Sequence, residues 1–185
     1  MKSLYSFIVK PYLERYDNVK EIDGKSIIIN TTISKHEFIS KKAVVVSTPT
    51  AFDTNIKQGD IVYIHHNIFR RWYDQRGKER NSASYFKDDM YFCSLDQIYM
   101  YNKTCHLDYC FVKPIKEKSN LTVSNEKEHF GILKYSNSSL EAVGLKPGAL
   151  VIFTPNSEFE FIIDDEKLYC MKSKDIAITY GYEEN

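Results

Sequence analysis

The chain contains the stretch Lys57-Gln58-Gly59-Asp60-Ile61-Val62-Tyr63-Ile64, and a related stretch begins 89 residues later as Lys146-Pro147-Gly148-Ala149-Leu150-Val151-Ile152-Phe153. Each stretch places a glycine two residues after a lysine and then continues with apolar residues. Because glycine adopts a positive φ without steric penalty, each stretch predicts a tight turn that leads into a buried strand. The recurrence indicates that the chain repeats a small β-rich domain.

Two further pairs of blocks support an internal repeat. Upstream, Phe7-Ile8-Val9-Lys10-Pro11 recurs as Cys110-Phe111-Val112-Lys113-Pro114, and downstream Ser94-Leu95-Asp96-Gln97-Ile98-Tyr99 recurs as Ser173-Lys174-Asp175-Ile176-Ala177-Ile178. The first pair predicts an opening strand that ends at a proline, and the second a polar turn before a closing strand. The offsets between copies fall from 103 to 89 to 79 residues, so the second copy lacks first 14 and then 10 residues. We expect these differences to mark two loops of the first copy.

Composition and the repeat together give the fold class. Fourteen Tyr and 11 Phe among 185 residues favour strands, and no long stretch has helical periodicity. Several short strands with turn signals between them are typical of a small barrel or sandwich. We therefore expect an all-β protein of two tandem small β-barrels, in residues 1–102 and 109–185.

The same composition excludes several function classes. Twenty-five basic and 25 acidic residues cancel, so the whole chain has no net attraction to nucleic acid or an anionic membrane. No apolar run is long enough to span a bilayer, and the first ten residues make a poor secretory signal. Four cysteines are too few for a disulfide scaffold and indicate reduced thiols in the cytoplasm. The chain shows no catalytic motif and no phosphate-binding glycine loop, so we expect neither an enzyme nor a cofactor.

The repeated blocks resemble the GroES-type co-chaperonin family. That family opens with a strand ending near Val-Lys, as at Val9-Lys10, and continues with a long mobile loop that carries a glycine and aliphatic residues. A Lys-x-Gly-Asp turn into an apolar strand follows, as at Lys57–Val62, and a Ser-x-Asp segment closes the domain, as at Ser94–Asp96. The resemblance covers nearly the whole chain twice and implies two GroES-like β-barrels.

The resemblance also implies a binding site in the first copy. The segment Asp23-Gly24-Lys25-Ser26-Ile27-Ile28-Ile29-Asn30, here called the aliphatic segment, stands where the family has its mobile loop, within residues 17–35. Its chaperonin-binding residues would be Gly24, Ile27, Ile28 and Ile29, docking on a GroEL-type chaperonin ring. From the residues alone, the isoleucines are equally compatible with a buried strand, although the flanking polar residues favour a loop. The second copy has only a short polar stretch at Glu117–Glu128 and lacks an equivalent.

A second anomaly lies in residues 67–89, where the family has a shorter hairpin. Ile68–Arg80 combines five basic with three aromatic residues, a mixture found in single-strand nucleic-acid binders and in protein interfaces. We expect an extended hairpin that contributes a protein interface through Phe69, Arg70, Arg71, Trp72 and Tyr73.

Histidine and cysteine pairs give no metal prediction. His65-His66 follows an apolar strand, where neighbouring side chains point to opposite faces, and Cys105-His106 with Cys110 lacks a second pair at zinc-site spacing. The sequence thus predicts a cytoplasmic homo-oligomer that caps a chaperonin and assists protein folding. The alternatives are an architectural barrel protein that has lost chaperonin binding and, less favoured, a single-strand nucleic-acid-binding barrel.

Overall fold

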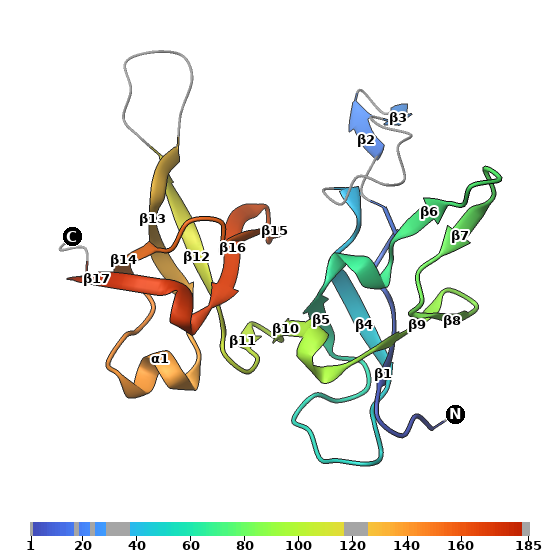
Figure 1. Ribbon diagram of the computed structural model, residues 1–185, viewed down its shortest axis with the longest axis horizontal. Helices are drawn as coiled ribbons and strands as arrows, with labels where there is room; N and C mark the ends of the chain where they lie inside the picture. Colours follow the sequence, from blue (N-terminus) through green and yellow to red (C-terminus); the bar gives the residue numbers. More distant parts are fainter. Residues whose placement is uncertain (1, 17–18, 23–24, 29–37, 117–125, 183–185) are drawn as a thin grey trace. The chain divides into compact units, whose positions relative to one another are not determined.

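The computed structural model describes residues 2–16, 19–22, 25–28, 38–116 and 126–182. The chain divides into two compact units, Met1–Asn102 and Lys103–Asn185 (Figure 1). Strands dominate both units, and the described residues form a single short α-helix, which confirms the expected all-β class. Within these residues, no helix has the length and apolar character that crossing a membrane requires.

The first unit is built on a sheet in which the strands follow one another in the order β10-β5-β4-β1-β9-β8. Two separate pairs, β2 with β3 and β6 with β7, form two-stranded ribbons. Two short 3-10 helices, η2 (His66–Ile68) and η3 (Leu95–Gln97), precede β6 and β10. The strands are β1 (Phe7–Pro11), β2 (Val19–Ile22), β3 (Lys25–Ile28), β4 (Lys42–Ser47), β5 (Ile61–Ile64), β6 (Arg71–Tyr73), β7 (Glu79–Asn81), β8 (Tyr85–Lys87), β9 (Met90–Cys93) and β10 (Ile98–Tyr101).

The second unit has a 6-stranded sheet in the order β15-β16-β12-β13-β14-β17. Helix α1 (Ser138–Ala142) lies between β13 and β14, and the 3-10 helix η4 (Ser173–Asp175) precedes β17. Strand for strand, this is the order of the first unit, with β12, β13, β14, β16 and β17 in the places of β1, β4, β5, β9 and β10. The strands are β11 (Thr104–Cys105), β12 (Tyr109–Lys116), β13 (Glu126–Tyr135), β14 (Ala149–Phe153), β15 (Phe159–Ile163), β16 (Glu166–Lys172) and β17 (Ile176–Tyr182).

The two sheets also share their registers, including the position of one irregularity in the ladder of the opening strand. The ladder of β1 with β4 shifts directly before Val9, and the ladder of β12 with β13 shifts directly before Val112. The predicted glycine turns are confirmed, because Gly59 and Gly148 have φ values of 90° and 95°. The equivalent pairs are Val9↔Val45 with Val112↔Leu133, Val9↔Tyr91 with Val112↔Tyr169, Ala43↔Val62 with Gly131↔Val151, and Ile98↔Ile64 with Ile176↔Phe153.

One predicted equivalence is displaced by one residue. The sequence blocks match Asp96 with Asp175, whereas the hydrogen bonds match Gln97 with Asp175. The backbone N–H of Ser94 donates to Gln97 Oε1 at 3.0 Å, and that of Lys172 donates to Asp175 Oδ2 at 3.2 Å. The turn requires an acceptor side chain three residues after its start, and an amide meets this requirement as well as a carboxylate does. Matching by residue identity therefore misses the shift.

The predicted closure of each domain into a barrel is not observed, because among the described residues no ladder joins β8 to β10 or β15 to β17. Each sheet nevertheless curves around its own core. In the first unit, Cys93 of β9 and Ile98 of β10 belong to one buried cluster although three strands separate β9 from β10 in the sheet. In the second unit, Met171 of β16 and Val151 of β14 likewise share a cluster. The domains are curved open sheets.

Candidate functional site

The aliphatic segment lies between β1 and β4. Its residues Ile27 and Ile28 belong to β3, and the backbone of β3 pairs with that of β2. Gly24 and Ile29, the other two predicted binding residues, lie outside the described residues.

This connection is longer than its counterpart in the second unit. In the ladders, Pro11 faces Ala43 across 31 intervening residues, whereas Pro114 faces Gly131 across 16. The first of the two expected extra loops is therefore the segment that carries the predicted site.

Both ends of this connection are fixed to the first unit. Tyr16 and Ile39 form an antiparallel bridge, and the N–H of Ser40 donates to the carbonyl of Arg15 at 3.1 Å. Tyr16 and Ile39 are also buried, and both belong to the hydrophobic core of the unit. The chain thus departs and returns through a closed neck.

Arg15, at this neck, holds the base of the β6–β7 hairpin. Its Nε donates to the carbonyl of Phe69 at 2.5 Å, its Nη2 to the carbonyl of Arg70 at 3.1 Å, and its Nη1 to Asn81 Oδ1 at 2.7 Å. The guanidinium lies 5.0 Å from the centre of the Tyr91 ring. One cation therefore binds both strand ends of the hairpin and stacks on the core, as a planar group with five donors can.

Tyr16 makes a second connection between the neck and the hairpin. Its hydroxyl accepts a hydrogen bond from the backbone N–H of Arg71 at 2.9 Å, and the Arg71 guanidinium lies 4.5 Å from the centre of its ring. Arg71 also forms an ion pair with Glu79 across the hairpin, at 3.0 Å. The β1–β4 connection and the β6–β7 hairpin are the two insertions that distinguish the first unit. They therefore meet at their bases.

The tip of the hairpin is organised by Asp74. Its Oδ1 accepts the backbone N–H groups of Arg76 and Lys78, both at 2.9 Å, and its Oδ2 accepts Arg80 Nε at 2.9 Å. The backbone hydrogen bond from Lys78, followed by that from the Arg80 side chain, lowers the pKa of this carboxyl. The carboxylate form of Asp74 therefore favours the folded turn.

The structure separates the predicted interface residues into two groups. Phe69 has no exposed surface and packs edge-on against Tyr91, with ring centres 4.9 Å apart, so it belongs to the core. Trp72 and Tyr73 are 45% and 57% exposed and lie on β6, which Figure 1 shows extending away from the main sheet with β7. Arg70 is exposed at the hairpin base.

Sequence reasoning missed the residues that join the two insertions. Arg15, Tyr16 and Asn81 stand 54 to 66 residues from their partners. The one available signal was the Arg15-Tyr16 pair directly before the predicted loop. The sequence does not indicate which residues this pair would contact.

The histidine pair lies at the start of η2, and the cysteines lie in the protein interior. His65 is not a strand residue but precedes η2, so its ring stacks on that of His66 at 4.4 Å instead of pointing to the opposite face. Its Nδ1 accepts the N–H of Asn67 at 3.1 Å, and burial lowers its pKa. All four cysteines are buried, and burial raises the pKa of Cys110 to about 12. Within the described residues, no group of three or more His, Cys, Asp or Glu side chains could hold a metal ion.

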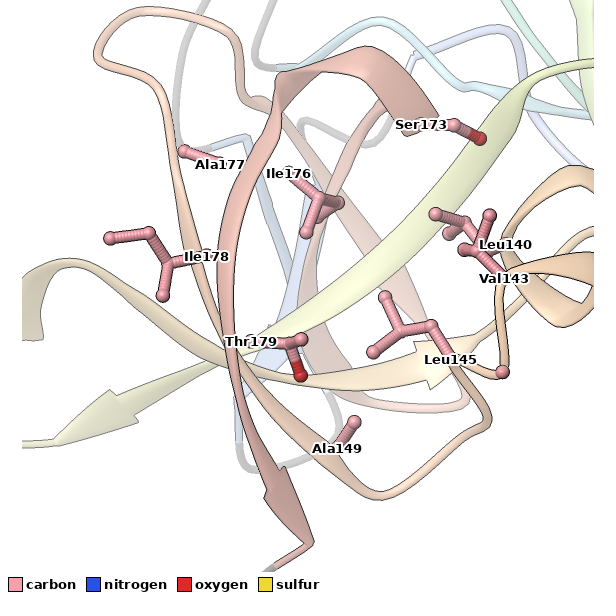
Figure 2. A pocket seen from close by; sticks show the side chains of 10 residues that line it. Leu140, Val143, Leu145, Ala149, Ser173, Ile176, Ala177, Ile178 and Thr179 are labelled. Atoms are coloured by element: carbon pink, nitrogen blue, oxygen red, sulfur yellow. The ribbon is translucent and has the colours of Figure 1, made fainter.

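The second unit contains an open hollow of about 400 Å³ between α1 and β17 (Figure 2). Leu140 and Leu145 line it from the helix side, and Ile176 and Ile178 from the strand. Its polar side chains are Ser173 and Thr179, and the Ser173 hydroxyl donates to the Asp108 carbonyl at 3.0 Å. The hollow offers apolar contact and no acid–base group.

The chain matches no family model and no curated protein. The geometry at the bases of the two joined insertions is therefore the basis on which a function is proposed below.

Proposed function

We propose that this protein is a GroES-type co-chaperonin-like module, non-enzymatic and oligomeric, that caps a GroEL-type chaperonin ring through the aliphatic segment and so assists protein folding. The observation that supports the proposal is the closed neck at Tyr16 and Ile39, which fixes both ends of the segment to the core of the first unit. A docking element needs such a base, because binding force must be transmitted to the domain that carries it. The two curved sheets would be GroES-like barrels whose seams are not hydrogen-bonded.

The energetics favour several weak contacts over one strong contact. Burial of three isoleucines contributes about 5–9 kcal/mol, at about 1.5–3 kcal/mol each. Ordering eight free residues would cost about 8–16 kcal/mol. The backbone of Lys25–Ile28 already pairs with β2, and leaving these four residues out of the sum would halve the cost to about 4–8 kcal/mol. Gain and cost then nearly balance for one segment.

An oligomer resolves this balance. Several segments on one assembly share an effective concentration, which raises avidity by about 10²–10⁴-fold without any new contact. The proposal therefore requires self-association of the chain. We assign it to the second unit, in which the connection between Pro114 and Gly131 is shorter and β14 leads directly to β15.

The test is capture of a purified GroEL-type ring by the full chain. The variant Ile27→Ser/Ile28→Ser/Ile29→Ser is expected to lose capture and to retain the thermal unfolding midpoint of the wild type. The matched control is Leu121→Ser/Val123→Ser, in the short polar stretch of the second copy, and it should capture the ring normally. Absence of capture by the wild type would refute the proposal. A triple variant that fails to fold would instead identify the isoleucines as buried structural residues, as the architectural alternative predicts.

A further inference from the structure

The β6–β7 hairpin carries more positive charge than its own fold uses. Residues 70–81 contain five cationic and two acidic side chains. Both acids are already engaged, Asp74 with Arg80 and Glu79 with Arg71. Within the described part of the chain, Arg70, Arg76 and Lys78 form no ion pair, and all three are exposed. The hairpin therefore presents three uncompensated cations.

The same hairpin presents aromatic surface beside these cations. Trp72, which is the single tryptophan of the chain, and Tyr73 expose about half of their surfaces. Exposed aromatic side chains next to arginines are the composition of protein-interface centres. A two-stranded ribbon gains little stability of its own from exposing them.

The location of the hairpin links it to the aliphatic segment. Arg15 binds Phe69, Arg70 and Asn81 at the hairpin base, and its own carbonyl accepts the N–H of Ser40, where the chain returns through the neck. A partner that holds the segment is thus brought to the base of the hairpin.

We propose that the β6–β7 hairpin is a second contact element that binds an acidic surface of the same protein partner that the aliphatic segment contacts. This inference rests on the proposed function and adds the chemistry of the partner surface. The three free cations supply attraction at long range, and the two aromatics supply contact area once the surfaces meet. At the equivalent place in the second unit, among the residues that the structure describes, β14 leads to β15 without such a ribbon.

A charge-reversal series tests the inference in the full chain. Arg76→Glu/Lys78→Glu is expected to weaken binding to a purified GroEL-type ring by about 10-fold or more at low salt and to flatten its salt dependence. Arg76→Gln/Lys78→Gln should show an intermediate loss. Both positions donate to Asp74 through backbone N–H groups, which the substitutions retain.

The matched control is Lys57→Glu/Lys146→Glu. It makes the same change in net charge at two exposed turn positions of the repeated blocks, and Figure 1 shows the β4–β5 connection at the opposite end of the first unit from the hairpin. This control is expected to bind as the wild type does.

The outcomes separate this inference from the proposed function. Failure of the wild type to bind the ring refutes both. Normal ring binding by the wild type and by Arg76→Glu/Lys78→Glu alike refutes the acidic-surface inference and leaves the aliphatic segment as the contact. Binding of single-stranded oligothymidine that is lost in the charge-reversal variant, while ring binding is unchanged, would assign the hairpin to nucleic acid instead.

Discussion

Tyr91 and Tyr169 occupy equivalent positions in the two units, opposite Val9 and Val112, and their surroundings differ. Tyr91 is fully buried beneath Arg15 and Phe69, and its hydroxyl donates to Asp89 at 2.8 Å. Burial raises the pKa of this hydroxyl, which therefore remains a neutral donor.

Tyr169 is only partly buried, and ion pairs surround it instead of insertions. Its hydroxyl donates to Glu126, and Lys167 lies 5.0 Å from its ring centre while pairing with Glu126 at 3.0 Å. The two units thus share a sheet and differ in what covers this tyrosine. In the first unit, both insertions attach beside Tyr91. In the second unit, the equivalent Tyr169 is covered by charged side chains of that unit.

The largest effect expected from this comparison concerns Phe69. Replacement Phe69→Ala should lower the free energy of unfolding by about 3–5 kcal/mol, because it removes a buried ring and leaves a cavity beside Tyr91. Urea denaturation followed by far-ultraviolet circular dichroism would measure the change. The matched substitution Trp72→Ala, three residues away on the exposed ribbon, should cost about 0.5 kcal/mol. Equal losses for the two variants would show that the whole hairpin, and not its base alone, belongs to the core.

A smaller effect is expected at one pair of equivalent positions in the two sheets. Gly131 and Ala43 are equivalent, but a Cβ on Gly131 would lie 2.2 Å from Val112 Cγ1 and 2.7 Å from the Lys113 carbonyl oxygen. Gly131→Ala should therefore destabilise the protein by about 1–3 kcal/mol through overpacking.

The reciprocal substitution makes this comparison sharper. Ala43→Gly should cost only about 1 kcal/mol, from a lost buried methyl and a more flexible unfolded chain. Thermal unfolding of both variants would rank them, and a harmless Gly131→Ala would mean that the β12–β13 ladder can widen freely.

The turns and strands that the two units share could be predicted from the sequence, because the residues that specify them are neighbours in the chain. A glycine with positive φ at Gly59 and Gly148, each followed by apolar residues, needs only its neighbours to specify a turn and a strand. The one-residue shift at Gln97 and Asp175 was missed because two different side chains meet the same hydrogen-bonding requirement. The joint between the insertions could not be predicted, since Arg15 finds its acceptors 54 to 66 residues away and two of the three are carbonyl groups that every residue possesses.

The smallest expected effect is a loss of structure at low pH that is confined to the hairpin tip and spares its base. Asp74 has a lowered pKa because its carboxylate accepts the Lys78 and Arg76 N–H groups and the Arg80 side chain. A carboxyl whose pKa is lower in the folded state stabilises that state above its ordinary pKa, and this contribution disappears as the pH falls through the lowered value.

Acidification below the ordinary range of aspartate should therefore loosen the tip while the Arg15 contacts, which involve no titrating acceptor, keep the base in place. The protection factors of the Arg76 and Lys78 amides, which correct the exchange rates measured by NMR for the intrinsic effect of pH, should fall before that of Arg71 as the pH is lowered. The variant Asp74→Asn should show fast exchange at the tip at every pH. Simultaneous loss of protection at tip and base would indicate that the ribbon opens as one unit, and that the Arg15 hydrogen bonds at the base depend on the Asp74 turn at the tip.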